Sequence, residues 1–226
     1  MTERKSLPLF AALDLNTLRE ARQTMDMLSG VVDAIKIGPR LYAQGGAHFL
    51  KEIVDHGCMS WGVDARLTAK ATEMARAKWD GPLWVKLTPQ APDIPAVARA
   101  AELAGASALV ASNTWLGMAI DTKRGVPVFA RRVAGVSGPA VFPLALRVVW
   151  DAAGAVKIPV IGCGGVDSAD AALAMIMAGA AAVEVGASLF AGFGVLKDIH
   201  EGLEAAVARW GVKNVSELVG KARETR

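Results

Sequence analysis

Short apolar runs alternate along the chain with longer stretches in which apolar residues recur at helical spacing. The short runs predict seven β-strands, at residues 9–15, 34–38, 59–65, 83–87, 108–112, 160–162 and 183–185. The longer stretches predict helices at residues 17–28 (capped by Asn16 or Thr17), 41–54, 69–78, 94–103, 141–153, 169–177, 196–210 and 215–223. A turn-rich excursion, residues 113–139, interrupts the alternation after the fifth strand.

This alternation is typical of a parallel sheet with helical crossovers, which defines the α/β class. The strands are nearly continuous apolar runs, so we expect a sheet that is covered on both faces. The pattern favours a (β/α)8 TIM-barrel type fold in a single domain, residues 1–226. Because seven strands are predicted, either an eighth lies within residues 125–133, or the barrel is seven-stranded, incomplete or closed by a partner. An open doubly wound sheet is the alternative.

Composition narrows the function classes. The 226 residues are 53% hydrophobic and 21% charged, which suits a large buried core. The net charge of +3 involves no run of Lys or Arg, so we expect no nucleic-acid partner, whereas a small anionic ligand fits. The two cysteines and three histidines lack metal-site spacing and favour a reduced, cytoplasmic protein. No signal peptide is expected, because residues 1–8 carry charges but no apolar core of the required length. No membrane span is expected either, because Asp170, Gly179 and Glu184 interrupt the most apolar stretch.

Glycines follow the last two predicted strands. Residues 161–165 read IGCGG, and residues 185–188 read VGAS, each just before a predicted helix. Glycine lets a phosphate approach backbone N–H groups, and the last two loops of a barrel commonly bind phosphate. We therefore predict a phosphate site there, with two tight turns as the alternative. Cys163 within the first loop is either a reactive thiol or a structural small residue.

Charged residues occur in and after the predicted strands. Lys36 and Lys86 lie within apolar strands, where a lysine is costly unless it is paired or functional. Asp14 and Asp64 end the first and third strands, and Arg66 follows Asp64 at i+2. These residues predict a polar site for an anion and a planar ring, although snorkelling lysines and stabilising salt bridges are alternatives.

Two further polar segments complete the expected site. Asn113 and Thr114 follow the fifth strand, and an Asn amide can both donate to and accept from a ring. Ser137 and Gly138 precede the helix at 141–153 and offer a hydroxyl and a backbone N–H.

The C-terminal part of the chain, residues 83–226, resembles the FMN-dependent dihydroorotate dehydrogenases. The resemblance rests on the segments VKLTP (85–89), ASNT (111–114), GMAID (117–121), VSGPA (136–140), PVIGCGG (159–165) and VGA (185–187). It implies that Lys86 contacts the flavin ring and that Asn113 and Thr114 face an orotate-like substrate. It also implies that FMN is held by Ser137, Gly138, Cys163, Gly164, Gly165, Gly186 and Ala187. The family's N-terminal loop with its catalytic Cys or Ser base has no counterpart in this sequence.

The N-terminal part, residues 8–78, resembles instead the orotidine 5′-phosphate decarboxylases. The matching segments are ALDL (12–15), AIKIG (34–38), YAQGG (42–46) and VDAR (63–66). This resemblance implies that Asp14 and Lys36 bind a nucleotide and that residues 64–69 are the catalytic strand, whose family pattern is Asp-x-Lys-x-x-Asp. Here Arg66 and Ala69 replace the lysine and the second carboxylate, and Arg hardly releases a proton.

Three functions therefore stay open at the level of the sequence. The expected catalytic residues are Lys86, Asp64 and Lys36, and the expected substrate-binding residues are Asn113, Thr114, Asp14 and Arg66. The first function is an FMN-dependent oxidoreductase of dihydroorotate dehydrogenase type, whereas Asp14, Lys36 and Asp64 support the second. The second is a decarboxylase-like lyase. The third is a barrel that binds a phosphate or nucleotide without catalysis. In each, the partners we expect are a small phosphate-bearing or pyrimidine ligand and a second copy of the chain in a homodimer.

Overall fold

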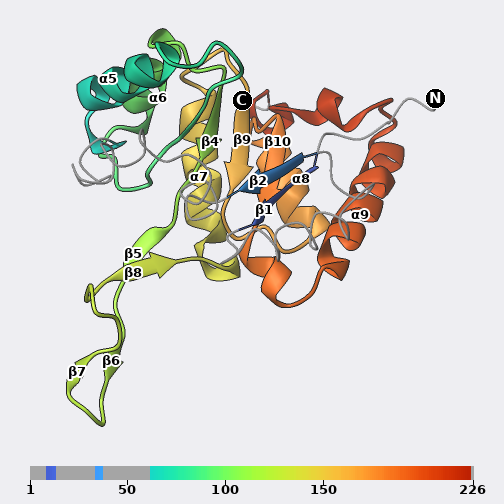
Figure 1. Cartoon of the computed structure of the whole chain (residues 1–226). Coiled ribbons are helices and arrows are strands. Elements are labelled where there is room, and N and C mark those ends of the chain that lie inside the picture. The colour runs from blue at the N-terminus through green and yellow to red at the C-terminus, as the bar shows by residue number, and fades with distance from the viewer. Residues whose placement is uncertain (1–8, 14–33, 38–61, 225–226) are drawn as a thin grey trace.

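The computed structural model describes residues 9–13, 34–37 and 62–224 (Figure 1). Six of the strands in these residues form one parallel sheet in the order β2-β1-β10-β9-β4-β3. The strands are β1 (Leu9–Leu13), β2 (Ala34–Ile37), β3 (Trp84–Lys86), β4 (Ala108–Ala111), β9 (Val160–Cys163) and β10 (Ala182–Val185). Six of the seven predicted strands are thereby confirmed as members of a parallel sheet.

The order of the strands is that of a ring opened at one place. The first strand, β1, lies between the second and the last, with Leu9 in register with Val183 of β10. The remaining strands of the sheet, β3, β4, β9 and β10, lie side by side in the order in which they occur in the sequence. The opening of the ring falls between β2 and β3. A doubly wound sheet instead reverses its strand order near the middle. The order therefore agrees with the α/β barrel expectation, while the described residues contain no strand pair that closes the ring.

Four helices build the core on one face of this sheet. They are α6 (Ile94–Leu103), α7 (Phe142–Ala153), α8 (Ala169–Met177) and α9 (Gly194–Trp210). Their buried residues pack with Leu109 and Val160 of the strands in one hydrophobic cluster. Side chains of Asp93 and Ser168 cap α6 and α8 by accepting the amides of Ala96 and Ala171. The small residues of these helices, such as Ala98, Ala145 and Ala172, allow close contact between helix and sheet.

The opposite face of the sheet carries a second, smaller cluster. Alternate residues of the central strands point there, namely Ala108, Val110, Ile161, Ala182 and the partly buried Cys163. We call this side the inner face. Most of its side chains are small, so they leave space between longer polar side chains that point to the same face.

The excursion between β4 and α7 forms an arm that projects from the body (Figure 1). Its base pairs β5 (Trp115–Gly117) antiparallel with β8 (Ala134–Val136), and its tip pairs β6 (Ile120–Asp121) with β7 (Val126–Pro127). The expectation that residues 125–133 hold an eighth strand of the main sheet is wrong. Strand β7 begins in that range, but it pairs only within the arm.

A second correction concerns residues 59–65. Within its described part, residues 62–63 are helical and Ala65 begins helix α5 (Ala65–Arg76), so this part is not a strand. The predicted helix at 215–223 is two short 3-10 helices, η3 (Val215–Leu218) and η4 (Lys221–Arg223). Two more precede α7 and α9, namely η1 (Pro139–Val141) and η2 (Ala187–Phe190). The helices predicted at 17–28 and 41–54 lie outside the described residues.

Two kinds of feature are absent from residues 9–13, 34–37 and 62–224. No helix there is both long enough and apolar enough to cross a bilayer. No three His, Cys, Asp or Glu side chains gather there in an arrangement that suits a metal ion.

We expect the sheet core to be sensitive to loss of volume at Leu109. This side chain of β4 is fully buried among the helices. Leu109→Ala should lower the free energy of unfolding by about 2–5 kcal/mol, because it leaves a cavity. Leu103→Ala is the matched control, since Leu103 on α6 is 87% exposed, and it should change stability by less than about 0.5 kcal/mol. Urea unfolding followed by circular dichroism measures both, and equal effects would contradict the assignment of the core.

Candidate functional site

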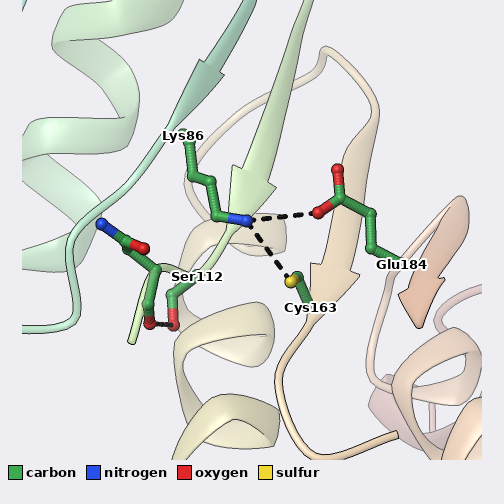
Figure 2. Close-up of polar contacts among 5 residues, drawn as sticks. Lys86, Ser112, Cys163 and Glu184 are labelled. Atoms are coloured by element: carbon green, nitrogen blue, oxygen red, sulfur yellow. Dashed lines mark hydrogen bonds and ion pairs between the residues drawn. The ribbon is translucent and has the colours of Figure 1, made fainter. Parts of the chain in front are cut away.

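Lys86 is the last residue of β3 and reaches across the inner face of the sheet (Figure 2). Its ammonium Nζ donates to Glu184 Oε2 of β10 at 3.2 Å and contacts Cys163 Sγ of β9 at 3.4 Å. The Lys86 side chain is 26% exposed, whereas that of Glu184 is 1% exposed. The sequence-based expectation that Lys86 is paired or functional therefore has a concrete basis: an ion pair with a buried carboxylate.

This ion pair requires a curved sheet. Strands β4 and β9 lie between β3 and β10, so in a flat sheet Lys86 and Glu184 would sit about 14 Å apart, three spacings of about 4.8 Å. Side chains stand roughly perpendicular to a sheet and would then run parallel without meeting. Contact at 3.2 Å means that the inner face is concave, so that the side chains of its outer and central strands converge.

Glu184 was missed as a site residue by the sequence analysis, which used it only as a break in an apolar stretch. The usable signal was its position within β10, where it is the one polar residue of Ala182–Val185. Its register partner in β9 is Cys163, a residue of the inner face. The same alternation that buries Val183 and Val185 against the helices turns Glu184 toward Lys86.

The glycine-rich loops that were expected to bind phosphate lie together. Gly165 has φ +72° and contacts the start of α7, since a Cβ there would lie 2.8 Å from the Gly138 carbonyl oxygen and 2.8 Å from the Phe142 nitrogen. Ser188 Oγ donates to the Val166 carbonyl at 2.7 Å and so ties the loop after β10 to the loop after β9. Three segments, at residues 137–138, 164–166 and 186–188, thus meet beyond the carboxyl ends of the strands.

Backbone donors are available in these loops. Within the described part of the chain, no acceptor is found for the amides of Gly164, Gly165 and Ala187. All three residues are partly exposed. Amides that lack a protein acceptor and are not fully buried can donate to an anion, which is the arrangement that backbone phosphate sites use.

Asn113 and Thr114 leave the end of β4 next to the end of β3. The Asn113 amide donates to the Leu87 carbonyl at 2.8 Å, and Gln90 Nε2 donates to the Thr114 carbonyl at 3.4 Å. Both residues are exposed, so these backbone contacts leave the Asn113 side chain accessible at the same edge of the sheet as Lys86.

Asp64 and Arg66 occupy a different setting from the strand end that was predicted. Asp64 caps helix α5 by accepting the amides of Arg66 and Leu67 at 2.8 and 3.1 Å. The hydrogen bond from the Leu67 amide, aided by that of Arg66 and its charge, lowers the pKa of Asp64 below its ordinary value. The Arg66 side chain is 92% exposed and lies 3.6 Å from the Asp64 carboxylate.

No polar contact within the described residues links Asp64 or Arg66 to Lys86, Cys163 or Glu184. Asp14 lies outside the described residues. Lys36 is in β2, where its backbone is in register with Ala12, and its side chain is outside the description.

The strand order defines a parallel α/β protein, and the inner-face ion pair and the converging glycine loops mark a candidate ligand site at the carboxyl ends of its strands. A model of the dihydroorotate dehydrogenase family matches residues 54–207, and the chain belongs to that family. The family has a TIM-barrel fold. The resemblance expected for the C-terminal part is confirmed over residues 83–207, and the match also covers residues 54–78, which were expected to resemble a decarboxylase. The comparisons give no support for the decarboxylase resemblance of residues 8–78, which stays a prediction.

Curated relatives carry the name dihydroorotate dehydrogenase B (NAD(+)), catalytic subunit. That of Trichlorobacter lovleyi is 46% identical over 167 residues, which are 74% of this chain and 55% of the relative. That of Methanosarcina mazei is 48% identical over 143 residues, or 63% of this chain and 46% of the relative. That of Desulforamulus reducens is 44% identical over 169 residues, or 75% and 56%. The chain thus spans about half the length of the curated relatives it matches.

The crowding at Gly165 leads to a stability prediction. Gly165→Ala adds a Cβ in the left-handed region and against the backbone of residues 138 and 142, so we expect unfolding to become easier by about 2–4 kcal/mol. Gly125→Ala is the control, because Gly125 has φ +66° with nothing within 4 Å, and should cost about 1 kcal/mol. Urea denaturation compares them; equal losses would mean that the two loops do not pack together.

Proposed function

We propose that the chain is an FMN-dependent oxidoreductase of the dihydroorotate dehydrogenase type, acting on a pyrimidine substrate from one barrel-type domain. The observation that carries the proposal is the convergence, at one edge of the sheet, of the Lys86 ammonium with loops whose amides are free of described acceptors. Family membership and the curated relatives support the same chemistry. FMN, when bound, would accept the two electrons removed from the substrate.

The glycine loops fit the phosphate end of FMN. Amides of Gly164, Gly165 and Ala187 have no acceptor among the described residues, and a Cβ at Gly164 would fall 2.7 Å from that of Ala145. Bare backbone is therefore required here, and bare backbone is what a phosphate needs for close approach. We assign the phosphate and ribityl contacts to these residues together with Ser137, Gly138, Cys163 and Gly186.

Lys86 suits the ring end of the cofactor. Its side chain is partly exposed, and its ammonium is held by Glu184 and Cys163. A fixed cation stabilises negative charge that develops nearby, and it does so without reorganising during the reaction. We propose that Lys86 faces the flavin ring and favours its electron-rich, reduced form.

Asn113 and Thr114 suit the substrate. They are exposed at the end of β4, and their backbone is anchored to Leu87 and Gln90. An amide side chain held there can donate to a pyrimidine carbonyl and accept from a ring N–H at the same time. We propose that this pair orients a dihydroorotate-like ring, and that Asp14, Lys36, Asp64 and Arg66 remain candidates without a described link to the site.

Partners follow from the relatives and the arm. The name "catalytic subunit" of the relatives supports a second, different subunit for this chain as well. The arm exposes apolar side chains, among them Met118, Ile120 and Val128, each more than half exposed. Contiguous exposed apolar surface is typical of interaction sites. We propose that the chain functions as a homodimer and together with an additional subunit.

The experiment that tests the proposed function is flavin binding. Purified protein should carry FMN or take it up, and the flavin fluorescence should be quenched on binding. Lys86→Met should weaken FMN binding about 10- to 100-fold, because a hydrogen bond to a charged group is worth about 1.5–3 kcal/mol. Lys197→Met is the matched control, since the Lys197 side chain is 73% exposed on α9, and should leave binding unchanged.

The outcomes separate cleanly. Colourless protein that ignores added FMN would overturn the proposed function. Binding that is equally strong in both variants would remove Lys86 from the cofactor site while leaving the flavin assignment intact. Oxidation of dihydroorotate by the FMN-loaded protein then tests the substrate. Tight binding of a pyrimidine nucleotide without flavin would instead favour the decarboxylase-like alternative.

A further inference from the structure

Glu184 is the one charged side chain among the described residues that is buried almost completely, at 1% exposure. Its side chain lies on the inner face, whose cluster is made of apolar residues such as Val110 and Ile161. Placing a carboxylate in such surroundings is unfavourable unless a cation compensates it. Lys86 provides a cation at 3.2 Å, and the two residues come from strands 98 positions apart in sequence.

Stability alone does not account for this pair. Replacing a buried ion pair by well-packed apolar residues is often neutral or stabilising, so a buried pair is weak support for a structural role. The remaining inner-face residues, such as Val110 and Ile161, show that apolar side chains fit this surface. The pair instead fixes a cation that is not fully enclosed, since Lys86 keeps 26% of its side-chain surface exposed.

We propose that Glu184 is a positioning residue that anchors the Lys86 ammonium and offsets part of its charge, and so sets the preference of the site for reduced over oxidised flavin. This inference rests on the proposed function. A lone ammonium would strongly favour the form of the flavin that carries extra negative charge. A carboxylate 3.2 Å from that ammonium opposes the effect, because its own field acts on the same ring with the opposite sign.

The decisive variant is Glu184→Gln, which keeps the size of the side chain and an oxygen that accepts from Lys86 but removes the charge. We expect the ratio of the affinities for reduced and oxidised FMN to rise about tenfold, which moves the two-electron midpoint potential about 30 mV more positive. Dye-coupled potentiometry measures the potential, and fluorescence titration measures the affinity for oxidised FMN. Glu204→Gln, an exposed change of the same charge on α9, should leave both values unchanged.

A double-mutant cycle tests whether Glu184 acts through Lys86. In a Lys86→Gln background, Glu184→Gln should shift the potential much less than in the unaltered chain, because the cation that it offsets is absent. Equal shifts in both backgrounds would overturn the positioning role. So would an unchanged or more negative potential in Glu184→Gln. A merely structural pair would alter the unfolding midpoint and leave the affinity ratio as it is.

Three further cases remain. If Glu184→Gln does not fold, Glu184→Asp replaces it; this variant withdraws the charge by one methylene and should shift the potential in the same direction by less. If the unaltered chain binds no FMN, the proposed function fails and this inference with it. If FMN binds but neither variant changes the potential, this inference alone fails.

Discussion

The site depends on the ion pair between Lys86 and Glu184. Two strands separate the residues that form it, so contact at 3.2 Å exists only because the sheet curls toward its inner face. That curvature also brings the strand ends together, and with them the loops at residues 137–138, 164–166 and 186–188. The curvature of one sheet therefore accounts for both the ion pair on the inner face and the meeting of the loops at the strand ends.

Most of the regular structure was predictable because the local signals agreed. Helix α6, for example, has a cap at Asp93, a proline in its first turn and an apolar stripe. Prediction failed at residues 62–65, where the run of Gly62 and Val63 resembled a strand end. The Asp64 cap and the alanine-rich stretch after it favour a helix there. The arm was seen only as turn-rich, because strands of two or three residues give no readable alternation.

The candidate site was predicted in outline. Lys86 stood out because a charged side chain in an apolar strand is costly unless it is paired or functional. The glycine loops stood out because two glycine-bearing turns follow neighbouring strands. Glu184 is likewise a charged residue in an apolar strand, but it was interpreted only as an interruption of an apolar stretch. Its partner Lys86 lies 98 positions away, and no local pattern reveals the pair. Asp64 shows the reverse case: an acidic residue after an apolar run is equally the signal of a helix cap.

The ring-like strand order has a consequence for how such a sheet tolerates change. β1 and β2 attach to the remainder through the edge of β10, and that attachment is made by main-chain groups that every amino acid except proline carries in full. Pairing at such an edge depends on the extended backbone of the incoming strands more than on their amino-acid sequence. The pairing of β1 with β2 and with β10 therefore depends on an extended backbone, whereas Gly164 and Gly165 admit no side chain without a clash.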